Sequence, residues 1–275
     1  MTDDILTRGR RGPAVTELQR LLSRRGFLTA IDGVFGEATE KAVRTFQGHA
    51  GLVVDGRAGS KTIQALQGGD CTALLQDEDL VRAAARLGLP LATVYAVNEV
   101  ESLGEGFLQG RVKILFERHQ MRRQLLVNRP DLDVGALSQQ YPNIINVKTG
   151  GYAGGAAEWA RFTDAVLIDE KSAIEASSWG AFQIMGYHWQ RLGYMSVHDF
   201  LAAMVRSESE QFDAFVRFIE TDKRLLKALK SRDWVAFASR YNGPAYAKNR
   251  YDTKLANAYN RYATCGCTAP GSIAA

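Results

Sequence analysis

Three short segments of this 275-residue chain carry side chains whose types could support acid–base chemistry. Glu101 and Ser102 stand at the end of a helical pattern, shortly before Gly104. A carboxyl group placed where a helix ends and a loop opens could donate or accept a proton. The second segment, residues 177–186, reads SSWGAFQIMG, and the third, residues 240–244, reads RYNGP. Each segment alone is a weak indication, because Ser, Asn and Gly are also common in turns and caps.

In this order and at these separations, the three segments resemble the lysozyme superfamily. Goose-type lysozymes and lytic transglycosylases carry a catalytic Glu-Ser, then S-x-G-x-x-Q-I-M, then Y-N-x-G. Two more segments, ILFERH at residues 114–119 and the glycine-rich residues 150–157, are similar to the N-acetylmuramidase family of phage endolysins. The resemblance covers roughly residues 77–268. It implies cleavage of the β-1,4 bond between N-acetylmuramic acid and N-acetylglucosamine in peptidoglycan.

Cleavage of a glycosidic bond needs a proton donor for the leaving oxygen, and an apolar pocket favours the protonated form of a carboxyl group. The resemblance implies that Glu101 is this catalytic acid. Glu99 is a rival, but it does not match the Glu-Ser motif. Residues two apart lie about 200° apart around a helix, so Glu99 and Glu101 cannot face the same cleft.

The resemblance also implies substrate contacts for four polar residues. Ser178 and Gln183 would line the cleft and bind sugar groups, unless they only stabilise a turn. Tyr241 and Asn242 would flank Glu101 and the saccharide, unless they only pack and cap a helix. The aromatic residues Trp179, Phe182 and Trp189 are expected in the core rather than as sugar platforms.

A second catalytic carboxylate is the usual partner of a glycosidase acid. None of the acidic residues after Glu101 stands in a position typical of a catalytic Asp in the family that this chain resembles. The hypothesis is therefore that a single Glu suffices, with water or the N-acetyl group of the substrate replacing the second carboxylate. The acids considered are Glu105, Glu117, Asp131, Asp133, Glu158 and Asp164.

The first 67 residues contain a repeated pattern. Residues 32–39 read DGVFGEAT and residues 55–62 read DGRAGSKT, so Asp, Gly, Gly and Thr recur at the same offsets with a period of 23. Asp-Gly favours a tight turn with a positive φ at Gly, and a Thr soon afterwards can cap or begin a helix. Apolar residues at helical spacing flank these turns. The pattern predicts three short helices joined by two matched turns.

Residues 9–66 resemble the three-helix peptidoglycan-binding domain of amidases and phage endolysins. The resemblance rests on G-x-x-V-x-x-L-Q-x-x-L, D-G-x-F-G-x-x-T-x-x-A-V-x-x-F-Q and G-L-x-x-D-G-x-x-G-x-x-T. It implies a wall-binding role. Candidate binding residues are four turn residues that are expected to be exposed, unless they only build the fold: Asp32, Gly33, Asp55 and Gly56. The expected core residues are Leu18, Leu21, Phe35, Val43 and Phe46.

These patterns together predict a mainly α fold. A small three-helix peptidoglycan-binding module would occupy residues 1–67, a linker residues 68–76, and a larger lysozyme-like catalytic domain with a small β element residues 77–268. Residues 129–158, rich in Gly, Asn and Pro, suit loops, short helices or that β element. The combination resembles modular endolysins of phages that infect Gram-negative bacteria.

The amino-acid composition limits the kinds of binding partner and cofactor that we expect. The net charge is +4, from 34 basic and 30 acidic residues. The basic residues are spread along the chain, which disfavours nucleic acid but allows attraction to an anionic wall. The three cysteines cannot all pair, and Cys265 and Cys267 are too close for an easy bridge, so we expect reduced thiols. The four histidines have no ligand spacing, so no metal or other cofactor is expected.

The N-terminal residues MTDDILTRGRRG lack the apolar stretch of a secretory signal, and no segment is apolar enough for membrane insertion. We therefore expect a monomer that stays in the host cytoplasm until a holin opens the way to periplasmic peptidoglycan. Two other functions stay open. One is a lytic transglycosylase that forms 1,6-anhydromuramic acid, and the other is a non-enzymatic wall-binding protein.

Overall fold

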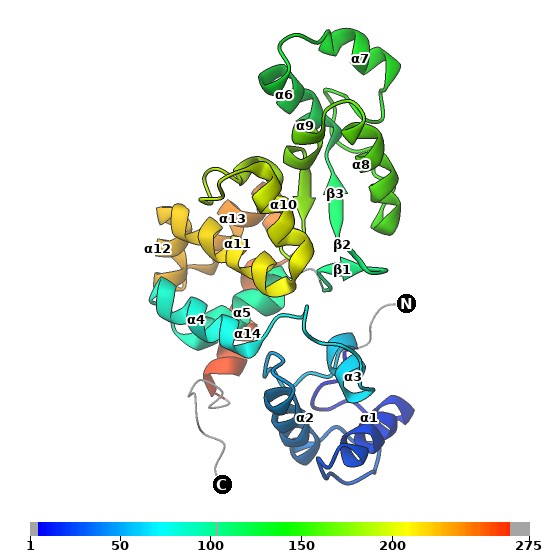
Figure 1. The fold of residues 1–275 in the computed structure, drawn as a ribbon. Helices are drawn as coiled ribbons and strands as arrows, with labels where there is room; N and C mark the ends of the chain where they lie inside the picture. Colours follow the sequence, from blue (N-terminus) through cyan, green and yellow to red (C-terminus); the bar gives the residue numbers. More distant parts are fainter. Residues whose placement is uncertain (1–4, 103, 265–275) are drawn as a thin grey trace. The chain divides into compact units, whose positions relative to one another are not determined.

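The computed structural model describes residues 5–102 and 104–264. Helices dominate this part of the chain, and the strands are short (Figure 1). The expectation of a mainly α fold with a small β element is confirmed. The chain forms two compact units, one of residues 1–99 with 229–275 and one of residues 100–228. Helix α5, which ends at Glu101, runs through the boundary between them.

The first three helices of the unit of residues 1–99 and 229–275 form a small bundle: α1 Pro13–Arg24, α2 Glu37–His49 and α3 Ser60–Leu66. Proline suits the first position of α1, because its fixed φ matches the helix and its missing N–H has no partner there. The expected core is confirmed, since the bundle buries Leu18, Phe35, Val43 and Phe46 to 4% exposure or less and packs Leu21 against them.

The two matched turns are each built around a buried glutamine. Gln19 donates to Asp32 Oδ1 at 2.9 Å and to Thr39 Oγ1 at 3.0 Å, and its Oε1 accepts the Gly33 N–H at 2.9 Å. Asp32 Oδ1 also accepts the Val34 N–H at 2.9 Å. The Asp and Thr of the motif are therefore the hydrogen-bond partners that a buried amide side chain requires.

The second turn repeats these bonds. Gln47 donates to Asp55 Oδ1 at 2.8 Å and to Thr62 Oγ1 at 3.2 Å, and it accepts the Gly56 N–H at 2.9 Å. The glycines Gly33 and Gly56 have φ values of 70° and 73°, which a side chain would strain. Both glycines are buried, so the expectation that they are exposed is wrong. Their backbone N–H groups turn inward to the glutamine.

Further helices complete this unit: α4 Asp77–Leu87, most of α5 Leu91–Glu101, the end of α12 Lys223–Ser231, α13 Trp234–Asn242, the short η3 Pro244–Ala247 and α14 Tyr251–Thr264. A capping box between Gln76 and Asp79 starts α4, and Gly88 ends it in the left-handed conformation. In residues 5–102 and 104–264 no single helix is long and apolar enough to span a membrane. Only α4 and α5 taken together reach such a length, and they bend by 119° between them.

The unit of residues 100–228 contains the two small sheets. Strands β1 Phe107–Leu108 and β2 Arg111–Val112 form an antiparallel pair. Strands β3 Ile114–Phe116, β4 Ser177–Trp179 and β5 Ile184–Met185 form an antiparallel sheet in the order β3-β4-β5. The register pairs Leu115 with Ser178, and Ser178 with Met185. The strands thus lie outside residues 129–158, which form loops and short helices, two of the alternatives that the sequence left open.

Helices α8 Glu158–Val166 and α9 Glu170–Glu175 pack against the three-stranded sheet (Figure 1). The other helices of this unit are α6 Arg118–Asn128, α7 Val134–Gln140, α10 Val197–Arg206, α11 Glu208–Thr221 and the start of α12, with the short η1 Gly155–Ala157 and η2 Gly186–His188. The core includes Phe116 and Trp179, both fully buried, and the ring of Phe162 meets Trp179 edge-on at 5.3 Å. Phe182 is also buried, so two of the three aromatic residues expected in the core lie there.

The first turn offers a direct test of the buried glutamine. We predict that Gln19→Leu lowers the free energy of unfolding by about 1–3 kcal/mol, because it leaves the buried Gly33 N–H without its acceptor. Urea denaturation followed by circular dichroism measures this change. The matched control is Gln64→Leu, an exposed glutamine with one bond, to Asp70 O, expected to change stability by less than about 0.5 kcal/mol. An equally small effect at Gln19 would show that the turn does not depend on it.

Candidate active site

Glu101 is the last residue of α5, and only 4% of its surface is exposed. The chain after it runs into Glu105 and Gly106, directly before β1. The sequence pattern predicts this position correctly, since the carboxyl group lies where a helix ends and a loop begins. A buried carboxyl group there is available for proton transfer only if the surrounding chain holds the helix end in place.

Backbone hydrogen bonds join the segment after Glu101 to the β4–β5 hairpin. The Lys113 N–H donates to the Gly106 carbonyl at 2.8 Å, and the Lys113 carbonyl accepts the Gly180 N–H, also at 2.8 Å. Gly106 follows the candidate acid, while Gly180 lies in the hairpin that carries the candidate sugar-binding residues. Burial lowers the pKa of the Lys113 side chain, although the nearby Glu105 acts in the opposite direction.

Two buried side chains of α11 add further hydrogen bonds to the same segments. Glu208 accepts the Gly106 N–H at 2.8 Å. Gln211 accepts the Ala181 N–H at 2.8 Å and donates to the Met204 carbonyl at 2.9 Å. Both residues are 1% exposed. No motif in the sequence marks these two residues, although a Glu and a Gln on the apolar face of an amphipathic helix are a signal of buried polar side chains with partners.

Ser178 and Gln183 lie together in the β4–β5 hairpin. The Ser178 hydroxyl donates to Gln183 Oε1 at 2.9 Å, and Gln183 Nε2 donates to the Gly180 carbonyl at 2.8 Å. Gln183 has a φ of 51°, which is unusual for a residue with a side chain. Ser178 is 5% exposed and Gln183 is half-buried. These bonds stabilise the turn, and sugar binding by the same pair stays a prediction.

Tyr241 and Asn242 end helix α13, in the compact unit of residues 1–99 and 229–275. The Tyr241 ring stacks on Phe237, with ring centres 5.7 Å apart and an interplanar angle of 6°. Both Tyr241 and Asn242 are half-buried. Packing against the helix accounts for one face of the tyrosine, and the contact of these residues with Glu101 or a saccharide stays a prediction.

Glu99, the rival carboxylate, has cationic and phenolic partners. Tyr262 donates to its Oε2 at 2.7 Å, Arg261 donates to its Oε1 at 2.5 Å, and Arg57 pairs with the same Oε1. Burial alone would raise the pKa of Glu99, but these three partners outweigh it and hold the pKa below its ordinary value. A carboxylate held in the charged form is a poor proton donor at neutral pH.

Several of the other acids contribute to the fold. Glu158 is fully buried, accepts the Gly154 N–H at 2.9 Å and pairs with Arg161 at 2.7 Å. Asp133 caps α7, and Asp131 pairs with Arg129. The hydrogen bonds and ion pairs of these three carboxylates therefore stabilise the fold.

Glu117 holds the glycine-rich loop next to β3. Its two oxygens accept the Tyr152 hydroxyl at 2.8 and 3.0 Å, and the Nδ1 atom of His119 lies 3.1 Å from one of them. Arg118 donates to the carbonyls of Lys148 and Thr149 at 2.9 and 2.8 Å. The ILFERH segment and the glycine-rich segment, noted separately in the sequence, thus form one structural unit.

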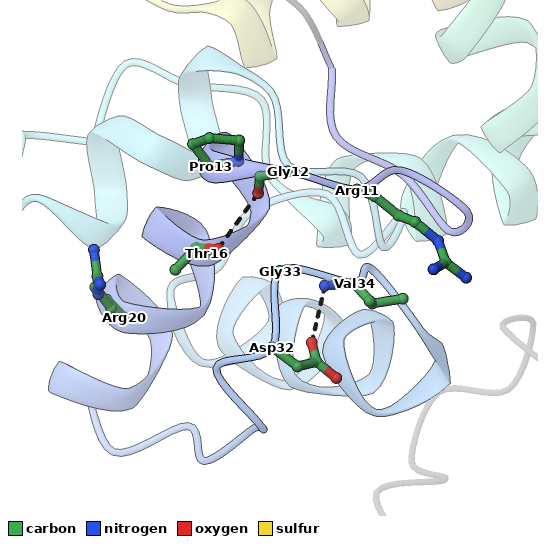
Figure 2. Close-up of a pocket in the computed structure, with 8 residues that line it drawn as sticks. All are labelled: Arg11, Gly12, Pro13, Thr16, Arg20, Asp32, Gly33 and Val34. Atoms are coloured by element: carbon green, nitrogen blue, oxygen red, sulfur yellow. Dashed lines mark hydrogen bonds between the residues drawn. The ribbon is translucent and has the colours of Figure 1, made fainter.

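The first turn of the N-terminal bundle borders an open groove of about 610 Å³. Figure 2 shows Arg11 and Arg20 at its two sides, with the turn of Asp32 and Gly33 between them. Asp32 is exposed, and hydrogen bonds from the Val34 N–H and Gln19 lower its pKa. The groove combines two cations, a carboxylate and apolar surface, a combination that suits a polar polymer such as peptidoglycan.

No group of three or more His, Cys, Asp or Glu side chains in residues 5–102 and 104–264 is arranged to hold a metal ion. Cys71 is a free thiol whose pKa is raised by burial and by Asp70. Cys265 and Cys267 lie outside the described residues.

A helix that ends in a buried carboxyl group, tied to a small antiparallel sheet, is the arrangement expected of a lysozyme-like glycosidase. Residues 90–263 match the model of the N-acetylmuramidase family, and the chain belongs to this family. Residues 11–66 match the model of a peptidoglycan binding domain.

Known proteins resemble either the whole chain or its N-terminal module. The crystal structure of the endolysin of Burkholderia phage AP3 superposes with a TM-score of 0.88 at 52% identity, over 94% of this chain and 99% of that one. The spore cortex-lytic enzyme of Bacillus cereus is 48% identical over 66 residues, 24% of this chain. The zinc D-Ala-D-Ala carboxypeptidase of Streptomyces albus G is 45% identical over 73 residues. The chain spans 26% and 29% of the length of these two proteins.

Proposed function

We propose that this protein is an endolysin that hydrolyses the β-1,4 bond between N-acetylmuramic acid and N-acetylglucosamine, with Glu101 as the general acid. The observation that carries this proposal is the burial of Glu101 at the end of α5 within a domain of the N-acetylmuramidase family. The similarity to a phage endolysin over 94% of the chain supports the role in lysis. Membership in a muramidase family disfavours a purely wall-binding protein.

In the proposed reaction, the Glu101 carboxyl group transfers its proton to the glycosidic oxygen as the bond to C1 breaks. Water then attacks C1, with or without prior participation of the substrate N-acetyl group, and a proton returns to the carboxylate. A single catalytic Glu is consistent with the structural roles of Asp131, Asp133 and Glu158. Ser178, Gln183, Tyr241 and Asn242 would bind the sugars.

Replacing the acid tests the first part of the proposal. We expect Glu101→Gln to lower the rate on purified peptidoglycan by about 10²–10⁴-fold, because the amide cannot protonate the leaving oxygen. The change is almost isosteric, so thermal unfolding should show a folded protein. Turbidity gives the rate. Mass spectrometry of the wild-type digest should show reducing N-acetylmuramic acid ends.

Two other carboxylates serve as matched controls. Glu105→Gln and Glu117→Gln should keep much more activity than Glu101→Gln, and a loss as deep at either would contradict the single-Glu mechanism. Digests dominated by 1,6-anhydromuramic acid would instead identify a lytic transglycosylase. Full activity of Glu101→Gln would refute the role of this residue.

We also propose that the groove beside the first turn binds the wall. Arg11, Arg20 and the turn of Asp32 and Gly33 line it. Arginine side chains can donate hydrogen bonds to carboxylate and carbonyl groups of peptidoglycan, and the cationic rim attracts an anionic polymer. Asp55 and Gly56 of the second turn were equally plausible candidates in the sequence, but that turn contacts α4 and α5.

Wall binding is measured best without cleavage. In a Glu101→Gln background, we expect Arg20→Ala to weaken cosedimentation with insoluble peptidoglycan about tenfold, because a charged hydrogen bond is lost. The matched control is Arg24→Ala, an exposed arginine on the same helix that does not line the groove. Equal effects at Arg20 and Arg24 would point to general charge attraction and would contradict the groove.

The route to the wall and the oligomeric state are further parts of the proposal. We propose that the protein accumulates in the host cytoplasm as a monomer and reaches periplasmic peptidoglycan through a lesion made by a holin. The similarity to a phage endolysin supports this route.

Expression in a Gram-negative host tests this route. Cells that make the protein alone should stay intact, and they should lyse rapidly once a holin is coexpressed, whereas Glu101→Gln should not lyse them in either case. Lysis without a holin, or protein in the periplasm of intact cells, would contradict the proposed route. Light scattering should give a mass near 30.3 kDa.

A further inference from the structure

The two matched turns of the N-terminal bundle have different neighbours. The first turn borders an open groove. The second turn, residues 51–58, contacts helices outside the bundle. The Val54 N–H donates to Asp77 Oδ1 at 2.9 Å, at the start of α4, and Leu52 forms a β-bridge with Gln76. Arg57 forms an ion pair with Glu99 of α5. All of these residues belong to one compact unit.

Glu99 is the centre of this contact. Its carboxylate joins Arg57 of the bundle to Arg261 and Tyr262 of α14. The pair is largely shielded from water, with 25% of the Arg57 side chain and 18% of the Glu99 side chain exposed. Shielded pairs with several hydrogen bonds interact more strongly than exposed surface pairs. Arg57 is itself fixed, because its backbone N–H donates to Asp55 Oδ1 at 2.8 Å.

A second contact fixes the earlier part of the same helix. Asp77 Oδ1, which accepts the Val54 N–H, also accepts the hydroxyl of Tyr95 on α5. The Tyr95 ring packs against Tyr262, with ring centres 5.1 Å apart. Tyr95 and Glu99 are four residues apart, so they lie on one face of α5. The second turn and α14 therefore hold the last two turns of the helix along this face.

The last turn of a helix is the part that most needs such support. Its final carbonyl groups lack partners within the helix, and helix ends fray. Glu99 lies in this turn, two residues before Glu101. Movement of the last turn would displace the carboxyl group of Glu101, and a displacement of about 1 Å can cost about 10²-fold in rate.

We propose that the second turn is a docking surface for α5 and α14, and that Glu99 is a positioning residue that holds Glu101 in place through its ion pair with Arg57. The N-terminal bundle then supports catalysis directly, in addition to attaching the enzyme to the wall. In this proposal, the first repeat of the motif binds the wall and the second repeat holds the catalytic helix α5. This inference rests on the proposed role of Glu101.

A soluble substrate separates the two contributions of the bundle. On a short soluble oligosaccharide of alternating N-acetylmuramic acid and N-acetylglucosamine, wall attachment no longer matters. We expect Arg57→Ala and Glu99→Gln, in the full chain, each to lower kcat about tenfold or more with little change in KM. The double variant should be no slower than the slower single variant, because both changes remove the same contact.

Two milder variants test the same contact in case Arg57→Ala or Glu99→Gln unfolds the protein. Tyr262→Phe keeps the ring packing and removes the hydroxyl that donates to Glu99, so kcat should fall while the unfolding temperature stays close to that of the wild type. Arg57→Lys keeps the positive charge and should restore part of the kcat lost in Arg57→Ala.

The matched control is Arg8→Ala. Arg8 forms an ion pair with Glu40 at 2.8 Å within the same bundle, and the variant should keep the wild-type kcat. Wild-type kcat in Arg57→Ala, Glu99→Gln and Tyr262→Phe, with Glu101→Gln inactive, would overturn the positioning role alone. An equal loss in Arg8→Ala would also overturn it. Activity of Glu101→Gln would instead refute the proposed function.

Discussion

Gly106 is buried, and its backbone N–H and carbonyl need hydrogen-bond partners within the protein because water does not reach them. Glu208 accepts its N–H, and the Lys113 N–H reaches its carbonyl. An added Cβ at Gly106 would lie 2.2 Å from Gln211 Oε1, so a side chain there would force the buried Gln211 away from its present position. An unpaired buried N–H or carbonyl costs about 1–3 kcal/mol. This requirement fixes the start of β1 to α11 and, through Lys113, to the hairpin with Ser178 and Gln183.

The sequence predicted those features whose residues are close together in the chain. The helix that ends at Glu101, the three-helix bundle and the matched turns follow from local periodicity and turn chemistry. The mainly helical class followed from the same patterns. Residues 129–158 were compatible with loops, short helices or a small β element, and they form loops and short helices. The strands lie at 107–116 and 177–185, where the pairing of β3 with β4 joins segments about 60 residues apart. Short strands of this kind carry little alternation for a pattern to detect.

The residues that sequence reasoning missed act over long separations. Glu208 meets Gly106 across 102 residues, and Gln19 meets Asp32 across 13. A sequence motif shows which residues recur, but it does not identify the residues that form hydrogen bonds with them. Thus Asp32 and Asp55 were, in the sequence, candidates either for wall binding or for building the fold alone, and each accepts hydrogen bonds from a buried glutamine and from its own turn. Their surroundings also differ: local hydrogen bonds lower the pKa of Asp32, while burial raises that of Asp55.

Glu99 and Glu101 show how the same side chain acquires different chemistry within one helical turn. About 200° of rotation separates them, so the two carboxyl groups have different neighbours. Glu99 meets two arginines and a tyrosine hydroxyl, which favour the charged form and make it a structural anchor. Glu101 is 4% exposed at the helix end, next to the segment that Glu208 and Lys113 hold. Cations that stabilise a carboxylate disfavour its role as a proton donor. Glu99 therefore serves to anchor α5 through its two arginines, while the role of proton donor is proposed for Glu101.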